Sequence, residues 1–185
     1  VYKRQGYDSA GIAFHEGSKF SMARETGRVN NLAESVQKKC SPASLGIAHT
    51  RWATHGAVTV SNTHPHLSYD KKFVLVHNGV IENFGALKRF LSDKGIDFAS
   101  ETDSEVLCNL IAFHYSELPE GENRFVDAVR QALPQCRGAY GIAVLCLDYP
   151  ETMIGARRGS PLVVGLGDEA NFIASDASAF VGRAK

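Results

Sequence analysis

Residues suited to chemistry concentrate in the segment HTRWATHG at positions 49–56. Arg51 supplies a fixed cation, and its planar guanidinium suits capture of a carboxylate through two parallel hydrogen bonds. Trp52 beside it is large enough to cover a small ligand and exclude water. The same residue types also suit a buried strand end with a stacked Arg–Trp pair. This segment alone therefore predicts either an anion-binding site or a structural contact.

Two later positions extend the pattern. Asn78 offers a side-chain amide donor and Gly79 a backbone N–H that a ligand can approach closely, a combination that fits an oxyanion hole. Asn-Gly is also a strong turn signal, so a simple turn is the alternative. Asp103 falls in the first turn of a predicted helix, where a carboxylate either stabilises the helix dipole or receives a substrate ammonium. Arg51 and Asp103 together would hold both ends of an α-amino acid.

Histidines are frequent between positions 49 and 77, and a metal site has to be considered. The two histidines of His64-Pro65-His66 resemble a pair of metal ligands, but no carboxylate or Cys is spaced to complete the site. The pattern favours hydrogen-bonded histidines that orient loops around a polar site, and we expect neither a metal nor a cofactor. Gly165-Leu166-Gly167 lacks the third glycine of a nucleotide-binding loop, and its β-rich flanks indicate a turn.

The bulk composition is that of one globular domain, with 185 residues of which 44% are hydrophobic and 22% charged. Lys+Arg and Asp+Glu both number 20, which argues against a nucleic-acid partner. No apolar run approaches the roughly 18 residues of a membrane span, so no membrane partner is expected. The four cysteines form no CxxC pair, and we predict reduced thiols in a cytoplasmic protein.

The elements that must position these residues are hairpin-like groups of strands with helices in between. Strands are predicted at 10–16, 19–25, 45–49, 73–77, 140–147, 152–157, 162–165 and 171–174, and helices at 28–39, 84–94, 103–115 and 125–133. Gly95 fits a helix C-terminus, and Thr102-Asp103-Ser104-Glu105 fits a capping box. Because regular βαβ alternation is missing, the pattern predicts a single α+β domain instead of a doubly wound parallel sheet.

Two of the predicted strands, 45–49 and 73–77, end in the polar residues described above. If these strands were neighbours in one sheet, Arg51 and Asn78-Gly79 would lie on a common rim.

Five ordered motifs resemble one family. They are HTRWATHG at 49–56, NTHPH at 62–66, VHNGVIEN at 76–83, SETDSEV at 100–106 and RGAYGIAVL at 137–145. They are similar to the N-terminal glutaminase domain of the glutamine–fructose-6-phosphate aminotransferases, also called glucosamine-6-phosphate synthases. The resemblance runs from the GYDSAG segment at 6–11 to FIASD at 172–176. It implies a fold of the N-terminal-nucleophile hydrolase type, a four-layer αββα sandwich of two antiparallel sheets.

The resemblance also implies a reaction. An N-terminal Cys would attack the side-chain amide of glutamine, with its own α-amino group as the base, and water would hydrolyse the resulting thioester. Downstream sugar-isomerase domains would use the released ammonia to convert fructose 6-phosphate into glucosamine 6-phosphate. Carried over by position, Arg51 would bind the glutamine α-carboxylate and Asp103 its ammonium, while Asn78 and Gly79 would form the oxyanion hole. The parent enzyme is expected to be a homo-oligomer.

Three more residues acquire roles from the resemblance. Trp52 would help to cover the site and to communicate with the sugar domain, and Thr54 and His55 would line the glutamine pocket. The chain also departs from the family, because no Cys precedes Gly6 and Gln5 replaces an Arg. We interpret residues 1–5 as non-native. The expectation is one glutaminase domain over residues 1–185, truncated at both ends, without sugar-isomerase domains and without activity of its own.

Two alternatives stay open at this point. One is a class II amidotransferase domain of purine synthesis, a class less similar to HTRWATHG. The other is a non-catalytic glutamine-binding module that has lost its nucleophile. The residues after Lys185 would separate the first alternative, and the native N-terminal residue would separate the second.

Overall fold

The computed structural model describes residues 8–27, 29–40, 43–51 and 57–182. Their strands are β1 Ser9–His15, β2 Phe20–Thr26, β3 Gly46–Arg51, β4 His66–Leu67, β5 Phe73–Ile81, β6 Gly138–Cys146, β7 Met153–Arg158, β8 Val163–Leu166 and β9 Asn171–Ala174. The helices are α1 Val29–Lys39, α2 Phe84–Asp93, α3 Asp103–Glu117 and α4 Arg124–Ala132, with 3-10 turns at Leu133–Gln135 and Ala177–Phe180. None of these helices is long and apolar enough to cross a membrane.

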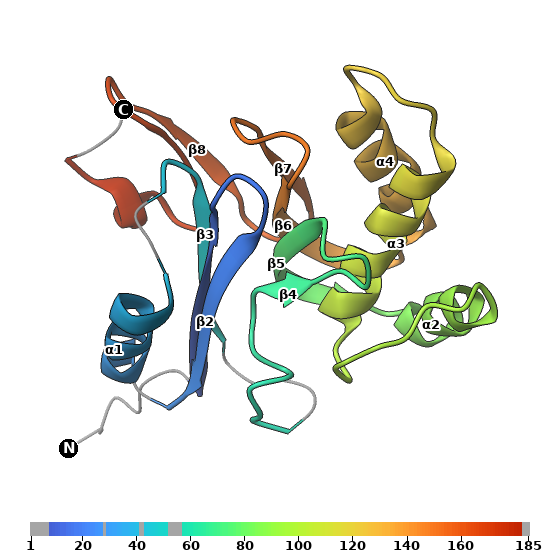
Figure 1. Ribbon diagram of the computed structural model, residues 1–185, viewed down its shortest axis with the longest axis horizontal. Helices are drawn as coiled ribbons and strands as arrows, with labels where there is room; N and C mark the ends of the chain where they lie inside the picture. Colours follow the sequence, from blue (N-terminus) through green and yellow to red (C-terminus); the bar gives the residue numbers. More distant parts are fainter. Residues whose placement is uncertain (1–7, 28, 41–42, 52–56, 183–185) are drawn as a thin grey trace.

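Two antiparallel sheets lie between helical layers. One sheet has the order β2-β1-β3 and the other β4-β5-β6-β7, while β8 and β9 form a separate hairpin. Helix α1 packs on β1 and β2, and α3 packs on β4 and β5 with α2 and α4 beside it. Figure 1 shows this succession, with α1 on one side, the sheets in the middle and α2, α3 and α4 on the other side. The predicted α+β, αββα architecture is confirmed.

Apolar side chains fill each interface between the layers. The space between the sheets contains Ala13, Ile47, Val74, Ala143 and Leu145, all buried. The other face of the four-stranded sheet packs on α3 and α4 through a larger cluster that includes Phe73, Leu75, Ile142 and Val144. Strands β5 and β6 are therefore covered on both faces. This explains why each reads as a continuous apolar run instead of an alternating one.

The relation between β3 and β5 differs from the predicted one. Strand β3 pairs with β1, whereas β5 pairs with β4 and β6, so the two strands belong to different sheets. Strand β5 also continues beyond the predicted end at His77, and Asn78 and Gly79 pair with Gly141 and Tyr140 of β6. The turn interpretation of Asn78-Gly79 is thus wrong. The ladder to β6 continues through Ile81, and this tertiary pairing overrides the local turn propensity of Asn-Gly.

The predicted helix ends are largely confirmed. After α2, Gly95 has φ +82° and its N–H donates to Ser92 O, while Ile96 N–H donates to Leu91 O, the two bonds of a Schellman motif. At the start of α3, Thr102 Oγ1 accepts a hydrogen bond from the Glu105 N–H at 3.2 Å. The capping box is only half formed, because the Glu105 carboxylate binds the preceding loop instead of the Thr102 N–H.

The core between the sheets gives a direct stability prediction. Leu145 is fully buried there, and Leu145→Ala should lower the free energy of unfolding by about 2–5 kcal/mol, since the site cannot collapse between two paired sheets. Leu166→Ala is the matched control, because Leu166 is 63% exposed and should change stability by less than about 0.5 kcal/mol. Urea denaturation followed by circular dichroism would measure both, and equal losses in the two variants would contradict the described packing.

Candidate active site

A pocket of about 960 Å³ lies where β3 of one sheet meets β5 of the other, beside the first turn of α3. Four residues predicted to act together line it, namely Arg51, Asn78, Gly79 and Asp103. The structure brings these four residues to one pocket, although they meet across two facing sheets and not along one rim. The other predicted pocket residues, Trp52, Thr54 and His55, lie outside the described residues.

Arg51 brings a positive charge into the pocket wall. It is the last residue of β3, is 7% exposed, and pairs with Ser9 of β1. Its backbone oxygen accepts a hydrogen bond from the Asp8 N–H at 3.1 Å. Because the strand end is fixed by the β1 ladder and little water surrounds the side chain, its charge is weakly screened. Such a guanidinium favours a bound carboxylate.

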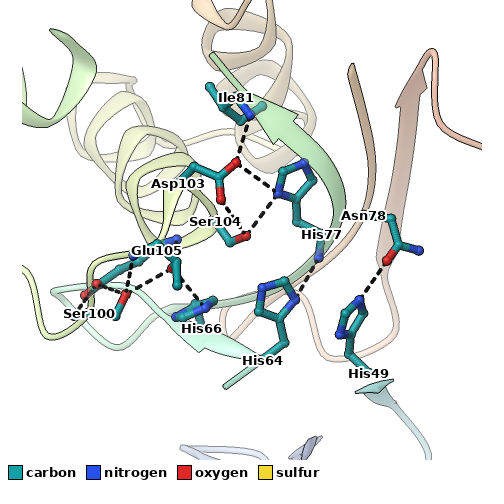
Figure 2. Close-up of polar contacts among 11 residues, drawn as sticks. His49, His64, His66, His77, Asn78, Ile81, Ser100, Asp103, Ser104 and Glu105 are labelled. Carbon is teal, nitrogen blue, oxygen red and sulfur yellow. Dashed lines mark hydrogen bonds and ion pairs between the residues drawn. The ribbon is translucent and has the colours of Figure 1, made fainter. Parts of the chain in front are cut away.

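Asp103 brings the opposite charge from the other layer. It is the first residue of α3, and its Oδ2 accepts a hydrogen bond from the Ile81 N–H at 2.8 Å. This bond ties the start of α3 to the end of β5, close to Asn78 and Gly79. A carboxylate accepts about four hydrogen bonds, so Asp103 keeps capacity for a ligand ammonium. The arrangement around its side chain is visible in Figure 2.

Asn78 and Gly79 contribute uncharged donors to the same wall. His49 Nε2 lies 2.8 Å from Asn78 Oδ1 across the two sheets (Figure 2). Since an amide oxygen only accepts, His49 donates, and the Asn78 NH₂ group is left to donate to a ligand. Gly79 has φ +130°, and a Cβ there would lie 2.1 Å from the Ala139 carbonyl oxygen. Only glycine fits this position, and its backbone N–H lies at the pocket wall without a side chain.

Buried histidines form a polar layer around these residues. His77 Nδ1 lies 3.0 Å from Ser104 Oγ and 3.8 Å from Asp103 Oδ2. His66 Nε2 lies 3.0 Å from Thr102 Oγ1. These contacts agree with the predicted role of histidines that orient the segments around a polar site. No group of three His, Cys, Asp or Glu placed to hold a metal ion occurs in the part of the chain that the structure describes.

The loop before α3 has a supporting residue whose importance the sequence did not reveal. Glu105 is buried, and its carboxylate accepts hydrogen bonds from the N–H groups of Ala99 and Ser100 at 2.8 and 2.6 Å. Asn62 Oδ1 holds the next residue by accepting from the Glu101 N–H at 3.1 Å. The capping pattern marked Glu105, but its loop partners depend on the tertiary path of the chain.

Burial lowers the pKa of the histidines in this layer. Desolvation is the largest cause for His49, His64, His66 and His77, and nearby positive groups such as Arg51 lower the pKa of His49, His64 and His66 further. The pKa of His66 falls to about 3. For His77 the Asp103 carboxylate opposes the shift without cancelling it. At neutral pH these rings are therefore uncharged and act as hydrogen-bonding groups.

Comparisons with known proteins place this fold and site in one family. Residues 49–182 match the family described as "Glutamine amidotransferase domain". The chain belongs to this family.

Curated relatives extend the match to most of the chain. It is 44% identical over 177 residues to the glutamine–fructose-6-phosphate aminotransferase [isomerizing] of Caldanaerobacter subterraneus subsp. tengcongensis, covering 96% of this chain and 28% of that protein. It is 46% identical over 172 residues to the protein of the same name from Acinetobacter baylyi, covering 93% of this chain and 27% of that protein. The chain thus spans less than a third of the length of these relatives.

Solved structures agree on the fold. The glutamine phosphoribosylpyrophosphate amidotransferase of B. subtilis superposes with a TM-score of 0.74 at 28% identity, covering 97% of this chain and 38% of that chain. A structure described as the allosteric regulatory enzyme of purine biosynthesis gives 0.76 at 28% identity, again covering 97% and 38%. The predicted fold of the N-terminal-nucleophile type is confirmed.

The buried histidines of the site, His49, His64, His66 and His77, predict a characteristic response of stability to acid. Each of these imidazoles has a lower pKa in the folded chain than its unfolded value of about 6.5, so the unfolded state binds protons first as the pH falls. The contribution of these histidines to stability should be constant above about pH 7 and decrease below about pH 6.5, with a slope of up to about 1.4 kcal/mol per pH unit for each histidine. Urea unfolding at several pH values would measure this.

His66→Gln is the informative variant for this prediction. Glutamine can still hydrogen-bond to Thr102 but does not titrate. The unfolding free energy of the variant should therefore fall less steeply than that of the wild-type chain between about pH 6.5 and 4. An unfolding free energy that stays flat over this range in the wild-type chain would contradict the described burial.

Proposed function

We propose that this chain is a glutaminase domain that binds L-glutamine in the pocket between the sheets. Arg51 binds the α-carboxylate and Asp103 binds the α-ammonium, which directs the side-chain amide toward Asn78 and Gly79. The observation that carries the proposal is the presence of opposite fixed charges and two neutral donors in the wall of one pocket. Zwitterionic amino acids match the charges, and a carbonyl that becomes an oxyanion matches the donors.

The chemistry proceeds by addition and elimination at the amide carbon. A thiolate forms an S–C bond, and the carbonyl oxygen becomes an oxyanion that accepts hydrogen bonds from Asn78 Nδ2 and the Gly79 N–H. As the intermediate collapses, the leaving nitrogen takes a proton from the general acid and departs as ammonia when the C–N bond breaks. Water then hydrolyses the thioester to glutamate and the free thiol. None of the pocket-lining residues that the structure describes is a cysteine. We assign the nucleophile to the N-terminal Cys that the family resemblance implies, with its α-amine as base and acid.

The acceptor of the ammonia is proposed from the relatives. Identities of 44% and 46% to proteins named glutamine–fructose-6-phosphate aminotransferase favour fructose 6-phosphate as acceptor and glucosamine 6-phosphate as product. The structures of purine-synthesis enzymes share 28% identity with the chain, which favours a purine precursor as acceptor less. We further propose that residues 1–185 serve as one glutaminase domain within a homo-oligomeric, cytoplasmic enzyme. The four free thiols fit a reducing compartment.

The assignment of the two charged residues can be tested by binding alone. Arg51→Ala should weaken glutamine binding by roughly ten- to a hundredfold, the cost of a lost charge-assisted pair, and in the active enzyme it should raise KM. Isothermal titration calorimetry of the 185-residue chain would measure the Kd. An unchanged Kd, or an unchanged KM in the full-length enzyme, would count against this role.

Ligand analogues make the same test specific for each end of glutamine. The α-amide of glutamine lacks the carboxylate charge, so Arg51→Ala should add little to its already weak binding. 4-Carbamoylbutanoate lacks the amino group, so Asp103→Asn should add little to its weak binding, although it should weaken glutamine itself. If the loss of affinity caused by a substitution and the loss caused by its matching analogue simply add, the assigned contact is contradicted.

Asn78 should affect the chemical step and not ground-state binding. Asn78→Ala should lower kcat for glutamine hydrolysis by about a hundredfold or more with a small change in KM, because the lost donor binds charge that develops only in the transition state. Steady-state glutaminase assays on the full-length enzyme would measure this. Asn78→Ser is the control, because it also removes side-chain volume but keeps a hydroxyl donor. A near-normal kcat in Asn78→Ala would reject the assignment.

A further inference from the structure

The orientation of the Asn78 amide depends on a residue from the opposite sheet. Asn78 belongs to β5 of the four-stranded sheet, whereas His49 belongs to β3 of the three-stranded sheet. The 2.8 Å hydrogen bond between His49 Nε2 and Asn78 Oδ1 therefore crosses the space between the sheets at the pocket wall. An amide side chain has two orientations that differ by half a turn. This bond selects the one that leaves Nδ2 for a ligand.

His49 is itself held in place. Its ring packs against the ring of His64, with centroids 4.3 Å apart, and His64 Nδ1 accepts a hydrogen bond from the His77 N–H at 3.4 Å. His77 immediately precedes Asn78 in β5. The His49 ring is thus supported by His64, which is hydrogen-bonded to the backbone of the residue before Asn78, as Figure 2 shows.

The hydrogen-bonding state of His49 also fits a single task. Its Nδ1 is buried and has no hydrogen-bond partner among the residues that the structure describes, so within that set Asn78 is the partner of this ring. Arg51 and His77 face the same ring, and burial together with these groups lowers its pKa. A neutral imidazole has one N–H, and the acceptor Asn78 Oδ1 requires this hydrogen on Nε2.

We propose that His49 is a positioning residue that fixes the Asn78 amide with its NH₂ group toward the reacting carbonyl. The inference rests on the proposed glutaminase function and deepens it. Without the His49 N–H, the amide can turn by half a rotation and present its oxygen to the oxyanion, which replaces an attractive dipole with a repulsive one. His49 is therefore expected to affect the chemical step through Asn78, without contacting the substrate.

The test compares two substitutions in the full-length enzyme. His49→Phe keeps a ring for packing against His64 but removes the donor. It should lower kcat for glutamine hydrolysis by about tenfold or more, with KM for glutamine within about twofold. His49→Gln restores an N–H donor and should recover most of the kcat. A wild-type kcat in His49→Phe, or no recovery in His49→Gln, would overturn the proposal.

His15→Phe is the matched control for general loosening of the sandwich. His15 is buried on β1, and its Nε2 also makes a cross-sheet hydrogen bond, to Leu147 O at 3.0 Å, but it does not line the pocket. It should lose at least as much unfolding free energy as His49→Phe while keeping kcat. If kcat falls equally in both variants, the effect of His49 is structural and the proposal fails.

A double-mutant cycle separates this inference from the proposed function. In the Asn78→Ala background, His49→Phe should cause almost no further loss of kcat, because the positioned group is gone. Additive losses would show that His49 does not act through Asn78. A near-normal kcat in Asn78→Ala would reject the oxyanion assignment and this inference together. A loss in Asn78→Ala with none in His49→Phe would reject only the role of His49.

Discussion

The face-to-face packing of two sheets is the constraint on which the site depends. Arg51 comes from β3 in one sheet and Asn78 from β5 in the other, so their separation is set by the thickness of the apolar layer between the sheets. That layer contains small side chains, Ala13 and Ala143, beside larger ones such as Leu145. A close-packed interior resists changes of even one methylene group, and this rigidity transmits directly to the pocket wall.

The polar part of this interface has a physical cost. Toward the pocket, apolar contacts give way to buried imidazoles that must stay neutral, because a charged imidazole in this environment is poorly solvated. Hydrogen bonds to Thr102, Ser104 and Asn78 offset part of the cost of burying these rings. Directional bonds fix side-chain orientation in a way that apolar packing does not. Such a layer is useful where donors have to point at one reacting group.

The sequence predicted the composition of the site better than its construction. Local signals located the helices, the N-terminus of α3 at Asp103 and the C-terminus of α2 near Gly95, because caps and turns depend on neighbouring residues. The charge pattern also led us to expect Arg51 and Asp103 in one site, and both line the same pocket. The pairing partner of β3 was not predictable in this way, since apolar strands of similar length fit either sheet. For the same reason Asn78-Gly79 was open to interpretation as a turn, although β5 continues through it to Ile81.

Gly11 illustrates a contact that no local signal could assign. It lies on β1 opposite His49, and a Cβ at this position would be 2.2 Å from the backbone oxygen of His64. Any larger residue would displace the loop that carries His64, because the obstacle is backbone and not the end of a flexible side chain. His64 in turn packs on the ring of His49, which hydrogen-bonds to Asn78. The last glycine of the GYDSAG segment is thus explained by close packing, and through His64 and His49 it bears on the orientation of the Asn78 amide.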